Sequence, residues 1–281
     1  MTTISSVLIV GLGLIGGSLA KRIKRYHPTV TLHGIAPSKN TINLASKSSL
    51  FKSVHQTIQS APKDIDCVFV CTPIHLIVDT IHAVSNHIES DCIITDVASV
   101  KKNIVESVKL SKQNHIFIPG HPMAGTEHTG FSASTETLFN DRSYILIKTK
   151  QDIPHFKDFI KALDVSLVET DADTHDKMIA LASHLPYVIT TLIISLVSTL
   201  SKDDQALFQS ILGPGFKDTT RVSASSPDWG LDVCRHNIDH IDTLLTSFEK
   251  AMTMFKDKLN TDIETLKPFF EEMKALKKHL H

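Results

Sequence analysis

The fold is decided near the N-terminus by the stretch Val7-Leu8-Ile9-Val10-Gly11-Leu12-Gly13-Leu14-Ile15-Gly16. Its apolar run predicts a β-strand, and the Gly-x-Gly-x-x-Gly pattern that follows predicts a tight turn into a helix. Gly11 suits the turn, Gly13 lets the backbone approach a pyrophosphate, and Gly16 lets helix and strand pack closely. The N–H groups at the helix N-terminus can then bind phosphate. The stretch therefore predicts a dinucleotide site; the alternative is a glycine-rich turn that serves packing alone.

The first half of the chain alternates short apolar runs with amphipathic ones. Strands are predicted at residues 7–10, 29–35, 67–71, 92–97 and 115–118, and helices at 14–25, 76–88 and 100–110. Two further strands are predicted at 143–149 and 165–169, with a helix at 153–163 between them. Strands that alternate with helices are typical of βαβ units and a parallel sheet.

Beyond residue 171 the pattern becomes helical. Helices are predicted at 174–200, 205–212, 236–259 and 263–280, and Pro268 should start, break or kink the last of them. The predicted fold is an α/β Rossmann-type dinucleotide-binding domain at residues 1–170, followed by an all-α domain at 171–281. The long apolar helix needs cover, which homodimerisation through the C-terminal helices would supply. The alternative is burial within one chain.

The composition is that of a globular protein. The 281 residues are 42% hydrophobic and 21% charged with a net charge of −1, which excludes disordered, collagen-like and polyelectrolyte chains. Residues 1–63 carry eight Lys and Arg but no Asp or Glu, which indicates a seat for an anionic ligand. Because these charges surround a nucleotide pattern without an aromatic platform, we expect no nucleic acid as a partner.

Several features bear on location and on metals. The four cysteines show no CxxC spacing, which is typical of a reducing cytosol, and no signal peptide is expected. The longest apolar stretch, residues 185–200, is short for a membrane span and contains polar residues. We therefore expect a cytoplasmic protein without a membrane partner. His236 and His240 lie four apart on a predicted helix, but no third ligand is near, so no metal is expected.

The end of the second strand bears on the choice of cofactor. An acid that holds the ribose 2′-OH usually stands there, and this position falls near Ala36. No acid is present, and Ser38, Lys39 and Thr41 could donate to a 2′-phosphate instead. The sequence favours NADP, with NAD as the alternative. The predicted cofactor contacts are Gly11, Leu12, Gly13, Leu14, Ile15, Gly16, Ala36, Ser38, Lys39, Thr41, Thr72 and Pro73.

Two segments follow the fourth and fifth predicted strands, residues 95–101 and 120–127. Both should emerge at the carboxyl ends of parallel strands, where open α/β sheets bind ligands. His121 stands between Gly120 and Pro122, which predicts a loop. Histidine, with an ordinary pKa of about 6.5, suits proton acceptance from an alcohol during hydride removal. Activity should then fall below an apparent pKa of about 6–7.

Five motifs occur in the order VGLGLIGGSLA (10–20), TDVASVK (95–101), GHPMAGTEHTG (120–130), SHLPY (183–187) and GPGFKDTTR (213–221). Together they resemble the prephenate and arogenate dehydrogenases, the TyrA family, over nearly the whole chain. The resemblance implies oxidative decarboxylation of a cyclohexadienyl substrate in tyrosine biosynthesis, with hydride transfer to NAD(P)+. Prephenate would give 4-hydroxyphenylpyruvate, and arogenate would give tyrosine.

The resemblance also implies the roles of individual residues. His121 would accept the proton of the ring hydroxyl, and Ser99 would contact the same hydroxyl and the nicotinamide. Arg221 would pair with a substrate carboxylate. The other substrate-binding residues would be Thr126, Ser183 and His184 in the pocket, Glu127 at its mouth and Lys217 at its entrance.

Two features depart from many prephenate enzymes. Tyr187 stands where they have the last histidine of HLPH, which leaves a keto or an amino substrate open. Residues 226–231 resemble the PxxG pattern of cyanobacterial-type arogenate dehydrogenases more than the PxMW pattern. With the missing ribose-binding acid, these features favour an NADP-using arogenate or dual-specificity enzyme. Neither a fused chorismate mutase nor an ACT regulatory domain is expected.

Two other interpretations remain open. One is a two-domain NADP-dependent dehydrogenase of the 3-hydroxyacid type, which would normally need a catalytic lysine on a helix of its second domain. The other is a non-enzymatic NADP-binding protein. The presence of His121, Ser99 and Arg221 together argues against the second.

Overall fold

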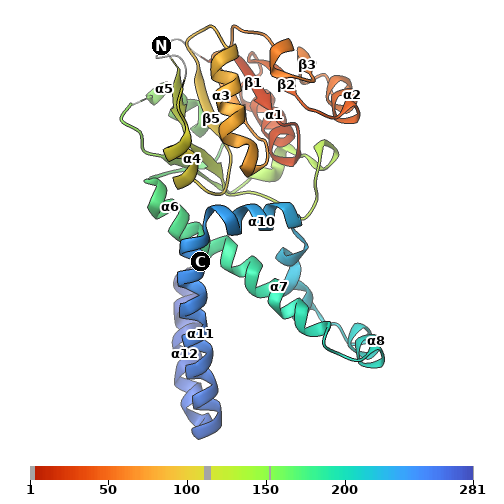
Figure 1. Ribbon diagram of the computed structural model, residues 1–281, viewed down its shortest axis with the longest axis vertical. Helices are drawn as coiled ribbons and strands as arrows, with labels where there is room; N and C mark the ends of the chain where they lie inside the picture. The colour runs from red at the N-terminus through yellow and green to blue at the C-terminus, as the bar shows by residue number, and fades with distance from the viewer. Residues whose placement is uncertain (1–3, 111–114, 152, 281) are drawn as a thin grey trace. The chain divides into compact units, whose positions relative to one another are not determined.

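The computed structural model describes residues 4–110, 115–151 and 153–280. The chain divides into two compact units, Met1–Asn237 and Ile238–His281 (Figure 1). The first unit contains two β-sheets with their helices, and the second is a helical hairpin. The functional boundary that the sequence places at residue 170 stays a prediction.

A six-stranded parallel sheet forms the centre of the first unit, in the order β3-β2-β1-β4-β5-β6. Its strands are β1 (Ser6–Val10), β2 (Thr31–Ile35), β3 (Ser53–His55), β4 (Cys67–Val70), β5 (Ile93–Asp96) and β6 (Ile116–Ile118). The connections contain α1 (Leu14–Tyr26), α2 (Lys39–Lys47), η1 (Ile58–Ser60), η2 (Ile74–Leu76), α3 (Ile77–His87) and α4 (Lys102–Ser107). The strand order reverses between β1 and β4, where sheets of this kind bind dinucleotides. The predicted Rossmann-type half is confirmed.

Apolar side chains bury this sheet on both faces. Ile9 packs with Leu19 of α1 on one face, and Leu8 packs with Ile81 of α3 on the other. Strands buried on both sides read as continuous apolar runs, which is why the sequence predicts most of them. The sequence does not predict β3, because it is a short, half-buried strand at the sheet edge.

A second sheet has the order β7-β8-β9, in which β7 (Gly120–Pro122) is antiparallel to β8 (Ser143–Ile147) and β8 is parallel to β9 (Ser166–Thr170). The elements η3 (Phe131–Ala133), η4 (Glu136–Phe139) and α5 (Pro154–Lys161) connect these strands. The predicted loop at His121 is wrong, because His121 pairs with Ile145 in the β7–β8 ladder. Gly120 makes the pairing possible, since a Cβ there would lie 2.9 Å from the ring of Tyr144.

The remainder of the first unit is helical. It comprises α6 (Ala172–Ile179), η5 (Ala180–His184), α7 (Leu185–Val197), α8 (Lys202–Ser210), α9 (Pro214–Thr220), η6 (Arg221–Ala224) and α10 (Pro227–His236). The single helix predicted at 174–200 is therefore interrupted, because η5 is a π turn. The sequence does not predict α9 and α10. Both begin with proline, whose missing N–H costs nothing in the first turn.

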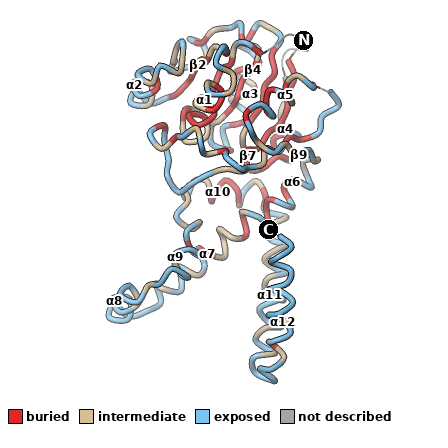
Figure 2. Tube along the Cα trace, turned by 180° about the vertical axis from the view of Figure 1, so that it is seen from behind, coloured by how far each residue is buried: buried red, intermediate tan, exposed pale blue. Residues whose placement is uncertain are grey.

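The segment Ala172–Val197 is long and apolar enough, by length and composition alone, to cross a membrane, with a mean hydropathy of 1.8. Only 22% of this apolar window is buried, and Leu192, Ile194 and Leu196 are exposed (Figure 2). The alternative that this apolar helix is buried within one chain is therefore wrong for the face that carries these three residues. The same segment also contains His175 and Asp176. Both of these polar side chains are buried in the interior of the first unit.

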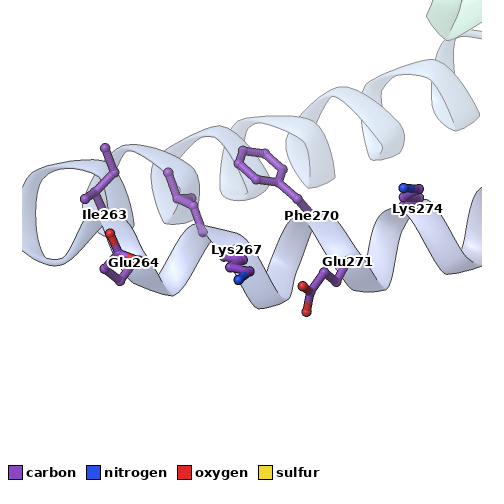
Figure 3. A pocket seen from close by; sticks show the side chains of 7 residues that line it. Ile263, Glu264, Lys267, Phe270, Glu271 and Lys274 are labelled. Carbon is purple, nitrogen blue, oxygen red and sulfur yellow. The ribbon is translucent and has the colours of Figure 1, made fainter.

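The second unit consists of α11 (Ile238–Thr261), η7 (Ile263–Thr265) and α12 (Leu266–His279). The rings of Phe255, Phe269 and Phe270 pack together with centroids 5.9–6.3 Å apart. Pro268 lies in the first turn of α12, so it marks a helix start. A groove along this hairpin is lined by Ile263, Glu264, Leu266, Lys267, Phe270, Glu271 and Lys274 (Figure 3), and none of the predicted site residues lies on it.

A buried arginine on α1 joins the two sheets of the first unit. Arg22 is 1% exposed, and its guanidinium donates to the backbone carbonyls of Leu163 (2.7 Å), Glu136 (3.0 Å) and Asp164 (2.9 Å). The planar fork of arginine suits several acceptors at fixed angles. The helix that carries the glycine turn is thus fastened to the connections of the second sheet.

Arg22→Met should therefore destabilise the protein strongly. The change leaves three carbonyls without their donor, and breaking a buried charged contact typically costs roughly 3–5 kcal/mol. The neighbouring Arg25, an exposed ion pair with Glu136, is the control, because exposed pairs contribute about 0–1 kcal/mol. Urea unfolding of both variants measures the difference. Equal losses for Arg22→Met and Arg25→Met would contradict a special role for Arg22.

Candidate active site

The glycine turn between β1 and α1 has the geometry of a pyrophosphate cradle. Gly11 has φ +99°, and a Cβ there would lie 2.6 Å from the carbonyl oxygen of Cys71. A Cβ on Gly16 would lie 2.1 Å from the oxygen of Gly11, so that position also requires glycine. Gly13 faces open space and caps α1 without a side-chain hydrogen bond. The N-terminus of α1 is thus left for an anionic ligand.

The other predicted cofactor contacts lie at the carboxyl ends of β2 and β4. Thr72 and Pro73 follow β4, and the Thr72 hydroxyl is buried with no partner among the described residues. Ala36 is buried after β2, and Ser38 caps α2 by accepting from the Thr41 N–H at 3.5 Å. Lys39 is exposed in the first turn of α2. Ala36, Ser38 and Lys39 thus lie where a ribose-binding acid usually stands, and Thr72 and Pro73 lie on the other side of β1.

The apolar side chains of this turn are buried or partly buried. Leu12 is buried in the core cluster, so only its backbone can meet a ligand. Leu14 and Ile15 are partly buried in the first turn of α1. The glycine turn therefore offers backbone N–H groups rather than side chains to the cofactor.

A buried carboxylate organises the end of β5. Asp96 accepts from the backbone N–H groups of Ala98 (3.1 Å) and Gly120 (3.2 Å) and from the Lys101 ammonium. Asp96 and Lys101 are both fully buried. The Ser99 hydroxyl, in the same loop, is buried with no partner in the described part of the chain. Asp96 thus holds together the loop that carries Ser99 and the strand that carries His121.

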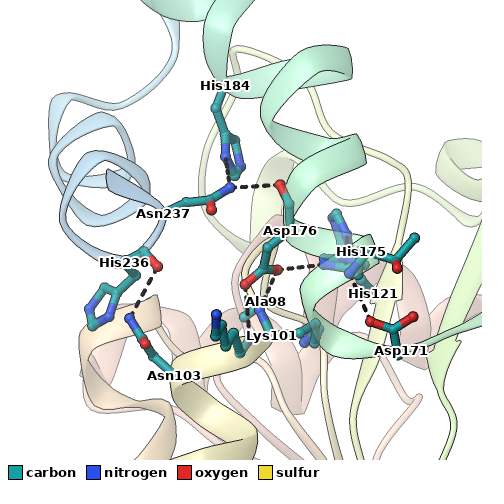
Figure 4. A network of polar contacts seen from close by, with 12 residues as sticks. Ala98, Lys101, Asn103, His121, Asp171, His175, Asp176, His184, His236 and Asn237 are labelled. Carbon is teal, nitrogen blue, oxygen red and sulfur yellow. Dashed lines mark hydrogen bonds and ion pairs between the residues drawn. The ribbon is translucent and has the colours of Figure 1, made fainter. Parts of the chain in front are cut away.

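A line of hydrogen bonds runs from His121 into α6 (Figure 4). Nδ1 of His121 lies 2.9 Å from Nε2 of His175, and Nδ1 of His175 lies 2.7 Å from Oδ1 of Asp176. The two oxygens of Asp176 also accept from the backbone N–H groups of Lys101 (2.7 Å) and Lys102 (2.9 Å). The first and second predicted domains therefore share one polar network within the first unit.

The π turn places His184 on this network. In η5 the Leu185 N–H bonds to the Ala180 oxygen, five residues back. Pro186 follows and has no N–H to give to a regular turn, which favours such a widening. The Asn237 amide lies 3.1 Å from Nδ1 of His184 and donates to the Asp176 carbonyl at 2.9 Å. Nε2 of His184 is buried and has no partner among the described residues.

Aromatic residues border His184. Trp229 stands edge-on to His184 at 6.0 Å and to Tyr187 at 5.2 Å between ring centroids. A Cβ on Gly230 would lie 2.3 Å from the Tyr187 hydroxyl oxygen, so Gly230 makes room for this tyrosine. Tyr187, which replaces the expected histidine, is thus accommodated by the glycine of the PxxG segment.

Burial keeps the histidines of the network neutral. Desolvation, with His175, Lys101 and His184 nearby, holds the pKa of His121 well below its ordinary 6.5. Desolvation lowers the pKa of His175, although Asp176 opposes this shift, and lowers the pKa of His184 to about 4. His121 is therefore a free base at neutral pH. The acidic limb expected from the sequence at about 6–7 is revised to a pH below 6.5.

The remaining predicted residues are more exposed. Thr126 and Glu127 lie on the loop after β7, Ser183 is half-buried in η5, and Arg221 begins η6. Nη1 of Arg221 lies 3.8 Å from Oε2 of Glu127, so these two are brought together. Lys217 is exposed on α9, and no ion pair in the described ranges involves it. The hydrogen-bond network thus contains His121 and His184, and Ser99 lies in the loop that Asp96 holds. None of the contacts of this network involves Lys217 in the described part of the chain.

Sequence reasoning missed four members of this network: Lys101, His175, Asp176 and Asn237. One signal was available, because His175-Asp176 places two adjacent titratable residues on a predicted helix ahead of His184. The helix predicted to carry both His236 and His240 is wrong, since α10 ends at His236 and α11 begins at Ile238. Among the described residues, no group of three or more His, Cys, Asp or Glu could hold a metal.

Two family models match the chain. The model described as prephenate dehydrogenase, nucleotide-binding domain, matches residues 19–169, and the one described as prephenate dehydrogenase, dimerization domain, matches 171–275. The chain belongs to the prephenate dehydrogenase family. Membership confirms the predicted order of a nucleotide-binding half and a helical half, and it supports NAD(P) use.

Individual relatives agree with the family assignment. Cyclohexadienyl dehydrogenase of Zymomonas mobilis is 32% identical over 252 residues, covering 88% of this chain and 86% of its own. The Aquifex aeolicus prephenate dehydrogenase, solved with hydroxyphenyl propionate and NAD+, has a TM-score of 0.90 at 26% identity, covering 100% of this chain and 99% of its own. Synechocystis arogenate dehydrogenase has a TM-score of 0.79 at 28% identity, covering 98% and 100%.

These comparisons confirm an oxidoreductase of the class that carries out oxidative decarboxylation in tyrosine biosynthesis. The 3-hydroxyacid alternative is not favoured. A 3-hydroxyisobutyrate dehydrogenase of Salmonella typhimurium has a TM-score of 0.59 at 10% identity, which is a likeness of fold alone.

The depressed pKa values predict a loss of stability in acid. The folded protein holds His121, His175 and His184 neutral, so below about pH 6.5 the unfolded chain binds more protons than the folded one. The free energy of unfolding should fall as the pH drops from about 6.5 toward 4, by at most about 1.4 kcal/mol per pH unit for each histidine.

Urea midpoints at pH 7.5, 6 and 5 measure this slope. His184→Gln should flatten it, whereas His128→Gln should leave it unchanged, because the His128 side chain is 73% exposed. A midpoint that stays constant from pH 7.5 to 5 would show that these histidines do not couple to folding.

Proposed function

We propose that the protein oxidatively decarboxylates prephenate, arogenate or both, with arogenate or dual specificity favoured by Tyr187 and the PxxG segment. The observation that carries the proposal is His121. Its buried, neutral imidazole is fixed at the carboxyl edge of the central sheet, beside the loop of the unpartnered Ser99 hydroxyl. A base and a polar contact for one substrate hydroxyl are what this reaction requires.

In the proposed mechanism, bound NAD(P)+ supplies the hydride acceptor. His121 takes the proton of the ring hydroxyl as the hydride leaves the same carbon, and Ser99 hydrogen-bonds that oxygen. Carbon dioxide then departs and the ring becomes aromatic, which supplies the driving force. Arg221 holds a substrate carboxylate in place of its loose contact with Glu127, because a guanidinium binds both oxygens. The chain mainly orients the substrate and excludes water.

The other substrate contacts follow from their positions. Nε2 of His184 is a buried group that a substrate oxygen would satisfy, and Ser183 stands beside it in the π turn. Thr126 and Glu127 would close the pocket from the β7 loop, and Lys217 would add positive charge outside it. All of these assignments are part of the proposal.

NADP is the proposed preferred cofactor. Residues 1–63 contain no acid to repel a 2′-phosphate, and Ser38, Lys39 and Thr41 surround the N-terminus of α2. The enzyme is further proposed to be a cytoplasmic homodimer, without membrane or nucleic acid. Support comes from the match to a dimerization domain and from the uncovered apolar face of α7.

Steady-state turnover of prephenate and arogenate, each with NAD and NADP, tests this proposal. NADP should give the lower KM, and Lys39→Ala should weaken NADP more than NAD. Lys47→Ala, at the opposite end of α2, is the matched control and should change neither. NAD binding about tenfold tighter than NADP would overturn the cofactor assignment. No turnover of either substrate would overturn the function.

His121→Asn tests the base. The variant should lower kcat by roughly 10²–10⁴, the usual range for general-base catalysis, and remove the acidic limb of the pH profile. Arg221→Ala should instead raise the substrate KM and lower kcat/KM roughly 10- to 150-fold, as expected for a lost charge-assisted contact. A His121→Asn variant with wild-type turnover would show that another residue takes the proton.

A further inference from the structure

We propose that His175 and Asp176 are positioning residues that decide which ring nitrogen of His121 is free to take the substrate proton. The inference rests on the proposed function, because it explains why His121 has the unprotonated ring nitrogen that the reaction needs. Neither residue belongs to the motifs by which the sequence resembles its family. Both residues are 1% exposed, in the line of hydrogen bonds that ends at His121 (Figure 4).

The direction of each hydrogen bond follows from the acceptor at the end of the line. A carboxylate can only accept, so His175 donates its Nδ1–H to Asp176 at 2.7 Å. A neutral imidazole carries one proton, which leaves Nε2 of His175 as an acceptor. His121 must then donate through Nδ1–H across the 2.9 Å contact. Nε2 of His121 is consequently bare, which is the form a general base requires.

Asp176 is itself fixed, so it cannot turn away from His175. Its carboxylate accepts from the backbone N–H groups of Lys101 and Lys102, and its carbonyl accepts from the Asn237 amide. The two N–H groups belong to consecutive residues at the start of α4, and Asn237 follows the end of α10. The start of α4 thus holds the carboxylate that orients His175, and Asn237 holds the backbone of the same residue.

The network also has a charge that suits the reaction. The ionisable groups around His121 and His175 are Asp96, Lys101, His175, Asp176 and His184. With both carboxylates ionised and the histidines neutral, one ammonium faces two carboxylates, so one negative charge is unbalanced. A proton accepted by His121 would neutralise this surplus. The surplus therefore opposes in part the burial that holds the pKa of His121 well below 6.5.

The tautomer can be observed directly by ¹⁵N NMR of the histidine rings in the complete protein, with His121 assigned from the spectrum of His121→Asn. The wild type should show a protonated Nδ1 and a bare Nε2 at His121. In Asp176→Asn, whose amide can donate to His175, the proton of His121 should move toward Nε2. A wild-type His121 protonated at Nε2 overturns the proposal, whether or not either substrate is turned over.

Kinetics of two variants supply the second readout. Asp176→Asn should lower kcat by roughly 10²–10⁴, as loss of an orienting carboxylate does in other histidine-based sites. Its acidic limb should move to lower pH, because a negative charge is lost. His175→Gln keeps the contacts of Asp176 with the backbone and should also lower kcat. Substrate KM and cofactor Kd should stay within about threefold in both.

Asp173→Asn is the matched control, on the same helix one turn earlier. Asp173 pairs with Lys102 at the surface, and its side chain is 57% exposed. This variant should keep the wild-type kcat, pH profile and tautomer. The proposal is overturned if Asp176→Asn and His175→Gln turn over at the wild-type rate. It is also overturned if kcat, cofactor affinity and thermal stability all fall together with no change of tautomer, since that result indicates a structural role alone.

Discussion

The buried carboxylate of Asp96 is the constraint on which the site depends. It stands where β5 ends and binds the N–H groups of two different segments, the loop at Ala98 and the strand at Gly120. It also neutralises Lys101, which is fully buried. A buried charge that loses its partner costs several kcal/mol, so neither group can leave without the other. The loop that carries Ser99 and the strand that carries His121 are thereby both held at the end of β5.

Two of the unpartnered buried hydroxyls near the end of β5 belong to residues that the sequence assigns to the cofactor and the substrate. Buried polar groups nearly always have hydrogen-bond partners. Within the described residues the Thr72 and Ser99 hydroxyls lack them, and these residues follow the neighbouring strands β4 and β5. Together with the open face of Gly13, they outline the surface on which the proposed cofactor and substrate would supply the missing partners.

The sequence predicts those parts of the fold that local patterns determine. The glycine turn and the buried parallel strands leave continuous apolar runs and fixed glycine spacings, so both could be predicted. The strand β7 could not be, because glycine and proline flank His121 and its partner Ile145 lies far along the chain. The pairing of His121 with His175 spans 54 residues and depends on how α6 packs, so no local pattern records it. The motifs that resemble the family indicated His121, Ser99 and Arg221, but not the residues that hold them.

The π turn Ala180–His184 also changes the angular relation between the two helices that it joins. A π turn adds one residue to the helical repeat, and one residue corresponds to about 100° of rotation about the helix axis. The buried face of α6 is therefore rotated about the helix axis relative to the corresponding face of α7. His175 and Asp176 face the interior, whereas Leu192 and Leu196 face outward. One nearly continuous helical segment can in this way present polar residues to the proposed active site along its first half and apolar residues to another surface along its second.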